Sequence, residues 1–165
     1  MLSNLIIAQS EQFDISTPKR TIQFAPITFD PSIHEMLTCC YTGSVLVLIS
    51  EDEKAELEKL AEIYIKYKIE RIFIPPAVLN FLMEESSVAQ QKNFKLSEIF
   101  ASGEQLTMSS ALVKFLENKE DCRLFNIYGP TETHVITGGL VEQYTVAANP
   151  DIGVPLLNIK YMKIH

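Results

Sequence analysis

The sequence has little of several residue types that mark special classes of protein. Among 165 residues it has three cysteines, no tryptophan, six glycines and eight prolines, and its 14 basic side chains are outnumbered by 21 acidic ones. This composition excludes a disulfide-stabilised miniprotein, collagen and a disordered chain. The net charge of -7 leaves no basic surface for nucleic acid or an anionic bilayer. We therefore expect no nucleic acid and no membrane as partners.

Long hydrophobic runs are missing too. No stretch approaches the ~20 apolar residues that cross a bilayer. Residues 1–9 have no positive flank and too short an apolar run for a signal peptide. The odd cysteine count, with Cys39 next to Cys40 in an apolar helical run, suits a reducing compartment. We expect a cytoplasmic protein.

The residues that are present predict an α/β domain. Hydrophobic residues make up 47% of the chain, and a domain of this size buries roughly two thirds of its unfolded surface. Short apolar segments alternate with helical patterns, which predicts a mostly parallel five-stranded sheet with helices on both faces. We expect strands at residues 21–25, 44–49, 71–74, 97–101 and 122–127, and helices at residues 32–41, 53–68, 77–85 and 108–118.

Three local patterns refine this prediction. Residues 45–49 are continuously apolar, which is typical of a strand covered on both faces. Ser50 and Glu53 are spaced as a capping box, and the dense charge from Glu51 to Arg71 indicates a solvated helix face. Residues 158–164 also resemble a strand.

The complete signatures of the common enzymes are missing. The chain has no G-x-x-x-x-G-K-[ST] loop, no G-x-G-x-x-G, no G-x-S-x-G and no H-E-x-x-H. His34, His134 and His165 have no metal-ligand spacing with the cysteines, so we expect no zinc site. Polar residues and helix breakers do follow three predicted strands, at residues 29–32 and 101–104 and at residues 126–133. Ligands of α/β sheets bind beyond the carboxyl ends of strands.

The segment after the fifth predicted strand is the richest in chemistry. Gly129 permits a tight turn and Pro130 fixes φ, so that Tyr128, Thr131 and Glu132 bring a ring, a hydroxyl and a carboxylate together. The alternative interpretation of the same residues is an ordinary turn followed by a helix cap, with no functional role.

Three segments together resemble the adenylation domains of nonribosomal peptide synthetases, within the adenylate-forming, AMP-binding ligase superfamily. Residues 126–132 match the N-x-Y-G-P-T-E core of that family. Residues 23–32 resemble its Q-F-A-x-x-x-F-D-x-S segment, and residues 152–156 with Asn158 and Tyr161 resemble its I-G-x-P segment. The motifs occur in the right order and span nearly the whole chain. The resemblance implies a flavodoxin-like fold.

The resemblance also implies a reaction. In that family an amino acid's carboxylate attacks the α-phosphate of ATP, pyrophosphate leaves, and the aminoacyl group passes to a phosphopantetheine thiol on a peptidyl carrier protein. ATP and Mg²⁺ are therefore the implied cofactors, and an amino acid and a carrier protein are the implied partners.

Each matching residue receives an implied role. Asp30 would hold the substrate's α-ammonium, although a helix N-cap is the alternative for this residue. Thr131 would contact the α-phosphate and Glu132 would bind Mg²⁺, as the catalytic pair, while Gly103, Asn126 and Tyr128 would contact the adenine. The side-chain pocket would consist of Pro31, His34, Phe73, Phe100, Ser102, Ile127, Val135 and Ile136. These walls suit a medium-sized side chain with one polar group. A partly buried helix residue is the alternative for His34.

The sequence departs from the family mainly by what it does not contain. The phosphate loop, the ribose-binding Asp, the hinge and the catalytic Lys have no counterpart, and Gly-Gly-Glu is replaced by Ser102-Gly103-Glu104. We expect residues 1–150 to be the central subdomain and residues 151–165 to begin a following, truncated one, with no activity in the chain alone. The alternatives are a stand-alone nucleotide and amino-acid binding module, another acyl- or aryl-CoA-ligase-like fragment, and an unrelated flavodoxin-like scaffold.

Overall fold

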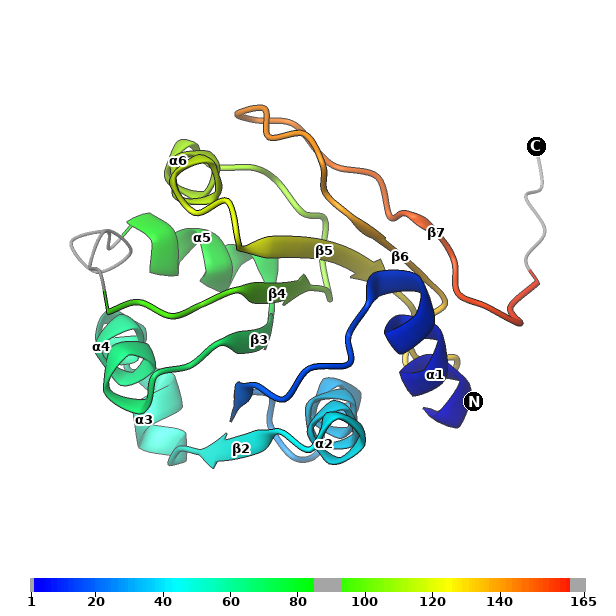
Figure 1. Ribbon diagram of the computed structural model, residues 1–165. Coiled ribbons are helices and arrows are strands. Elements are labelled where there is room, and N and C mark those ends of the chain that lie inside the picture. Colours follow the sequence, from blue (N-terminus) through cyan, green and yellow to red (C-terminus); the bar gives the residue numbers. More distant parts are fainter. Residues whose placement is uncertain (1, 85–92, 161–165) are drawn as a thin grey trace.

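A seven-stranded sheet with the order β2-β1-β3-β4-β5-β6-β7 lies at the centre of the protein (Figure 1). The computed structural model describes residues 2–84 and 93–160. The first five strands in this order are parallel, and β6 pairs antiparallel with both of its neighbours, β5 and β7. The predicted α/β class and parallel sheet are confirmed, with two strands added. The strands are β1 (Arg20–Gln23), β2 (Val45–Leu48), β3 (Arg71–Ile74), β4 (Glu98–Ala101), β5 (Arg123–Tyr128), β6 (Thr137–Leu140) and β7 (Val154–Pro155).

Helices cover both faces of the sheet (Figure 1). One face packs on α1 and α2, and the other packs on α4, α5 and α6. Side chains alternate along the strands. Ile72 therefore packs in the core beneath α4, α5 and α6, whereas its neighbour Phe73 packs in the core beneath α1 and α2. The helices are α1 (Leu2–Phe13), α2 (Asp30–Thr42), α3 (Glu51–Ala55), α4 (Leu57–Tyr67), α5 (Pro76–Glu84) and α6 (Ser110–Asn118).

Three phenylalanines form a cross-strand stack on the face covered by α1 and α2. Phe73, Phe100 and Phe125 are register partners on β3, β4 and β5. The ring centroids of Phe73 and Phe100 are 4.6 Å apart, those of Phe100 and Phe125 are 4.8 Å apart, and the rings are nearly parallel. Because stacked aromatic rings are large and stiff, this row gives a firm support to the loops that follow the three strands.

The strand order reverses between β1 and β3. From β1 the chain goes outward to β2 through α2, and it then returns to the other side of β1 at β3. The loops after β1 and β3 therefore diverge, and a crevice opens at the carboxyl ends of the strands. This is the place where the candidate site lies.

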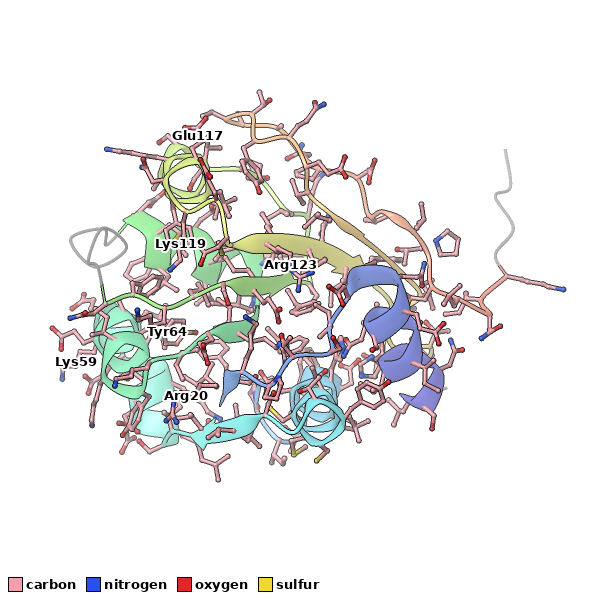
Figure 2. All side chains as sticks on the ribbon, in the orientation of Figure 1. Arg20, Lys59, Tyr64, Glu117, Lys119 and Arg123 are labelled. Carbon is pink, nitrogen blue, oxygen red and sulfur yellow. The ribbon has the colours of Figure 1, made fainter. Side chains whose placement is uncertain are left out.

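Buried charges gather at the opposite, amino-terminal edge of the sheet. Glu98 is 1% exposed and accepts hydrogen bonds from Arg71 Nε at 2.6 Å and Arg123 Nη2 at 2.7 Å, and Lys19 Nζ lies 3.8 Å away. Figure 2 shows Arg123 beside the strands at the centre of the protein, whereas Lys59 of α4 and Glu117 of α6 lie on the outer helices. Arg71 is 0% exposed, so its prediction as part of a solvated helix face is wrong. It begins β3, and its charge is compensated by Glu98.

The predicted elements need two further corrections. The helix expected at residues 53–68 is divided at Glu56, whose φ of -87° and ψ of 72° interrupt it. The capping box of Ser50 and Glu53 is confirmed, but it begins α3, which buries no residue, whereas α4 packs an apolar face on the core. Residues 45–49 are not covered on both faces, because β2 is an edge strand in which Leu48 is 70% exposed.

Helix α1 and strands β6 and β7 were not predicted. Gly138 and Gly139 in β6 are turn-forming residues by composition, yet here they allow close packing: a Cβ on Gly138 would lie 3.0 Å from Ile127 Cγ2 and Phe13 Cζ. The strand expected at residues 158–164 is not found at residues 158–160, and the rest of it lies outside the described residues. None of the helices within the described ranges is long and apolar enough to span a bilayer.

Candidate functional site

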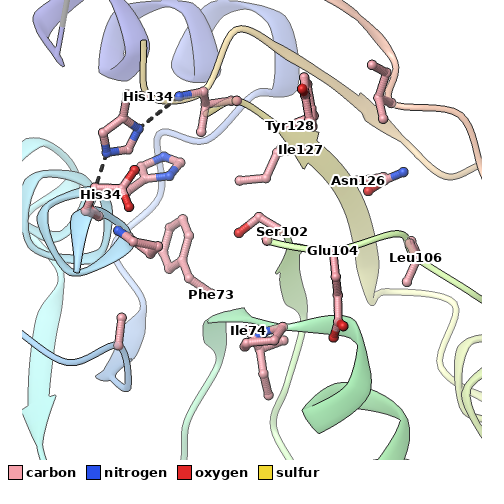
Figure 3. Close-up of a pocket in the computed structure, with 18 of the residues that line it drawn as sticks. His34, Phe73, Ile74, Ser102, Glu104, Leu106, Asn126, Ile127, Tyr128 and His134 are labelled. Carbon is pink, nitrogen blue, oxygen red and sulfur yellow. Dashed lines mark hydrogen bonds between the residues drawn. The ribbon is translucent and has the colours of Figure 1, made fainter. Parts of the chain in front are cut away.

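A cavity of about 1090 Å³ opens at the carboxyl ends of β1, β3, β4 and β5 (Figure 3). Its walls come from the loop between β1 and α2, the first turns of α2, the loop after β4 and the segment after β5. Most of the residues named from the motifs line it: Asp30, Pro31, His34, Phe73, Ser102, Gly103, Asn126, Ile127, Tyr128, Thr131 and Val135. Asp30 and the Tyr128–Thr131 loop therefore face one crevice.

Three of the named residues do not line the cavity. Phe100 is fully buried beneath it, between Phe73 and Phe125 in the aromatic row. Ile136 takes part in the sheet through its backbone, since its N–H donates to Tyr128 O at 2.9 Å. Glu132 is exposed on the turn that follows Thr131. The structure thus places Phe100 one layer below the cavity and exposes Glu132 to solvent beside Thr131.

Asp30 is the first residue of α2. The N-cap position belongs to Phe29 and has no side-chain cap hydrogen bond, so the alternative of Asp30 as an N-cap is wrong. Among the described residues, none donates a hydrogen bond to the Asp30 carboxylate, while the helix N-terminus beside it favours negative charge. The carboxylate is free to bind a cationic group in the cavity.

His134 joins the segment after β5 to the start of α2. Its Nδ1 accepts a hydrogen bond from Val135 N–H at 3.0 Å, so its Nε2 carries the proton and donates to Asp30 O at 3.2 Å. The residue is buried and its φ is +56°, a left-handed conformation that the fold must hold in place. His134 therefore keeps two walls of the cavity in register. Figure 3 shows both hydrogen bonds.

Two glycines shape the cavity for different reasons. A Cβ on Gly129 would lie 1.7 Å from His134 O, so the loop can close on itself only with glycine there. Gly103 has a φ of +95° with open space around the position of a Cβ, so its requirement is conformational. Both positions follow strands in the sequence motifs.

Two polar side chains are held by neighbouring backbone. Asn126 Nδ2 donates to Pro150 O at 3.1 Å and to Asp151 O at 2.7 Å, which leaves its Oδ1 as an acceptor. Glu104 Oε1 accepts from Ala77 N–H at 2.8 Å, in the first turn of α5. Both side chains line the cavity (Figure 3).

Glu35 supports the wall formed by the loop after β1. Its Oε1 accepts from Phe24 N–H at 3.1 Å and from Ala25 N–H at 3.0 Å, and its Oε2 accepts from Gln23 Nε2 at 3.1 Å. Phe24 and Ala25 line the cavity. Burial raises the pKa of Glu35 to about 7, against these hydrogen bonds and the charge of Lys54, which lower it.

This pKa predicts a pH-dependent stability. Because the folded state holds the Glu35 proton more tightly than the unfolded chain does, Glu35 makes the free energy of unfolding fall as pH rises from about 4.5 to about 7. His34, whose pKa is lowered from 6.5 to about 3, acts in the opposite direction between those values. The difference between wild type and Glu35→Gln isolates the first effect. As pH rises across this range, we expect the free energy of unfolding of Glu35→Gln to increase by up to about 3 kcal/mol relative to that of wild type, measured by urea unfolding. Parallel pH profiles of the two proteins would contradict the assignment.

Three residues that shape the site were not predicted. Glu35 carried a signal, because it lies on the buried helical face that also includes Ser32 and Cys39. His134 follows the best-matched motif, but nothing local indicates that its ring bonds to residue 30. Gln9, which contacts His34, lies on a helix that was itself not predicted.

The chain is similar to known proteins in sequence and in fold. The sequence profile of a family described as AMP-binding enzyme matches residues 1–164. Tyrocidine synthase 2 of Brevibacillus parabrevis is 28% identical over 95% of this chain and 4% of its own length. Bacitracin synthase 3 of Bacillus licheniformis is 35% identical over 95% of this chain and 2% of its own length. The chain thus spans a small part of these curated relatives.

Solved structures share the fold. The nonribosomal peptide synthetase FmoA3 superimposes with a TM-score of 0.82 at 18% identity, over 95% of this chain and 17% of that one. Its AMPPNP-bound form gives a TM-score of 0.81 at 19% identity over the same shares. The arrangement of strands and helices described above therefore also occurs in part of FmoA3.

Proposed function

Because the chain belongs to the family of AMP-binding enzymes, we propose that it is the central part of an amino-acid-activating adenylation domain and that its cavity seats an amino acid beside ATP. The parent enzyme would join the amino acid to the α-phosphate of ATP, release pyrophosphate, and pass the aminoacyl group to the phosphopantetheine thiol of a peptidyl carrier protein. The observation that carries this proposal is the single cavity shared by Asp30 and the Tyr128–Thr131 loop. The AMPPNP-bound form of FmoA3 supports ATP as the nucleotide.

The amino acid would be bound at the α2 side of the cavity. The free carboxylate of Asp30 would pair with the α-ammonium, and the side chain would lie among His34, Phe73 and Ile127. A hydrogen bond to a charged group contributes about 1.5 to 3 kcal/mol, which separates an amino acid from a simple carboxylic acid by roughly tenfold to a hundredfold.

The nucleotide would be bound on the side of β4 and β5. Tyr128 is 48% exposed and offers a ring face to a base. Asn126 Oδ1 is left free to accept from an adenine amino group, and Gly103 leaves open space beside its backbone. Thr131 at the rim would reach the α-phosphate. These donor and acceptor types fit an adenine nucleotide.

Magnesium would be held by Glu132. Mg²⁺ in nucleotide sites is bound through one or two carboxylates together with phosphate oxygens, and an exposed carboxylate next to Thr131 fits that pattern. No cluster of three or more His, Cys, Asp or Glu side chains forms a metal site in the part of the chain that the structure describes. When bound, Mg²⁺ would neutralise charge on the phosphates.

The chain alone would be inactive. Its cavity is lined by the carboxylates Asp30, Glu104 and Asp151, and no Lys or Arg of the described residues lines it. The charge that develops on the phosphates would therefore lack the cations on which such catalysis depends. A subdomain boundary near residue 150 and a cytoplasmic location stay predictions of the sequence.

The test is ATP–pyrophosphate exchange, measured on the chain alone and on the protein extended by the sequence encoded on either side. We expect no exchange by the chain alone and exchange that depends on one amino acid in the extended protein. Asp30→Ala should lower kcat/KM for the amino acid by about tenfold to a hundredfold. The matched control is Asp52→Ala, which removes an exposed carboxylate from the first turn of α3.

An extended protein that folds but shows no exchange with any amino acid would contradict the proposal. Tight ATP binding by the chain alone without exchange in the extended protein would favour the stand-alone binding module instead.

A further inference from the structure

A chain of hydrogen bonds runs from α1 to the ring of His34. Gln9 on α1 is 1% exposed, and its Nε2 donates to Thr38 Oγ1 at 2.8 Å. Its Oε1 then lies 2.6 Å from His34 Nε2. Because an amide oxygen only accepts hydrogen bonds, His34 Nε2 must carry the proton. The tautomer of His34 is therefore set by Gln9.

The His34 ring is neutral in this position. It packs on Phe73 at 4.6 Å and meets His134 edge-on at 5.7 Å between centroids. Burial, with further contributions from His134 and Arg71, lowers the pKa of His34 to about 3. With Nε2 protonated, Nδ1 has a lone pair and no proton, and none of the hydrogen bonds among the described residues involves it. His34 lines the cavity, and the Nδ1 lone pair is the polar group of its ring that is left for a ligand, so His34 can offer an acceptor and no donor.

The surroundings restrict what this acceptor meets. Of the side-chain pocket residues that line the cavity with His34, Phe73, Ile127 and Val135 are apolar and Ser102 carries a hydroxyl. A substrate side chain that ends in a carboxylate would place its oxygens against Nδ1, so that two acceptors would meet with no proton between them. A cationic substrate side chain would lose its hydration among the apolar walls. A side chain with a hydroxyl or amide N–H satisfies Nδ1, whereas an aliphatic one leaves a buried acceptor unpaired.

We propose that Gln9 is a positioning residue that holds His34 as a hydrogen-bond acceptor, and that the cavity therefore selects amino acids whose uncharged side chain donates a hydrogen bond. This inference rests on the proposed function, since it assumes that the cavity receives an amino acid. It assigns a role in selection to a residue on α1 that no motif includes.

The experiment is ¹⁵N NMR of the chain, with titration by two pairs of amino acids of matched shape, threonine against valine and asparagine against leucine. The ring ¹⁵N signals should show His34 protonated at Nε2. Threonine and asparagine should shift the Nδ1 signal and bind at least about tenfold tighter than valine and leucine.

Two variants separate positioning from a general structural role. Gln9→Leu removes the acceptor of the Nε2 proton, so both neutral tautomers should be populated and the preference for donors should weaken. Gln12→Leu is the matched control on the same helix, because Gln12 bonds to Pro155 O and Leu157 N–H, away from His34. It should leave the tautomer and the preference unchanged.

Each result has a distinct meaning. A protonated Nδ1 in wild type, or an unchanged tautomer in Gln9→Leu, would overturn the role of Gln9. Valine binding as tightly as threonine would overturn the selection for donors. If no amino acid shifts any cavity signal although the extended protein shows amino-acid-dependent exchange, the selection by His34 fails and the proposed function stands. If exchange is absent as well, the proposed function fails, while the ¹⁵N spectrum still decides the role of Gln9.

Discussion

Glu98→Ala is expected to lower the free energy of unfolding by about 3–5 kcal/mol. The carboxylate is the only acidic partner among the described residues for Arg71, whose guanidinium is fully buried. Removing it leaves a buried cation uncompensated, with Arg123 and Lys19 adding positive charge to the same place. The measurement is urea unfolding of the chain.

A surface carboxylate provides the control. Glu51 also makes an ion pair, with Lys54 at 2.8 Å, but its side chain is 75% exposed. Exposed pairs contribute about 0–1 kcal/mol, so Glu51→Ala should change stability little. A loss for Glu98→Ala no larger than that for Glu51→Ala would show that the amino-terminal charge network does not hold β3, β4 and β5 together.

Gly129→Ala is expected to disrupt the candidate site, although it adds only one methyl group. The added Cβ would lie 1.7 Å from His134 O and 2.7 Å from Val135 Cα, and both are backbone atoms that cannot rotate away. The segment would have to open, which would separate His134 Nε2 from Asp30 O. A displacement of about 1 Å in a positioned site costs on the order of a hundredfold in rate. We expect a loss of that size in amino-acid-dependent exchange by the extended protein.

Gly43→Ala is the matched control for this substitution. Gly43 ends α2 at a φ of +66° with no atom within 4 Å of an added Cβ. Its replacement should cost about 1–2 kcal/mol of stability through backbone strain alone and leave exchange unchanged at temperatures where the protein stays folded. Equal exchange rates for the two variants would contradict the proposed closure of the loop by Gly129.

Much of the site was predictable because its residues follow strands. Asp30, Asn126, Tyr128 and Thr131 lie next to apolar segments and helix breakers, and parallel strands bring their carboxyl ends to one edge. Local pattern and the general geometry of α/β sheets locate these segments, whereas the roles given to the four residues came from the family resemblance. The exceptions were Phe100, Glu132 and Ile136, since a residue's place in the sequence does not decide whether its side chain faces the cavity.

Residues that act through distant partners were not predictable in the same way. The Gln9–His34 hydrogen bond joins residues 25 positions apart, and the His134–Asp30 bond joins residues 104 apart. Neither pair leaves a periodic pattern. The burial of Arg71 depended likewise on Glu98 arriving from the next strand.

The amino-acid sequence by itself determined the positions of five strands, most of the helices, the capping box at Ser50 and the motifs of the family, because hydrophobic period, caps and turn residues act over a few neighbours. Only the tertiary structure decided that β2 lies at an edge, that Glu35 and Arg71 are buried, and that Gln9 of α1 contacts the ring of His34. These features depend on which distant segments pack together, and that choice is made by the free energy of the whole fold rather than by any local segment.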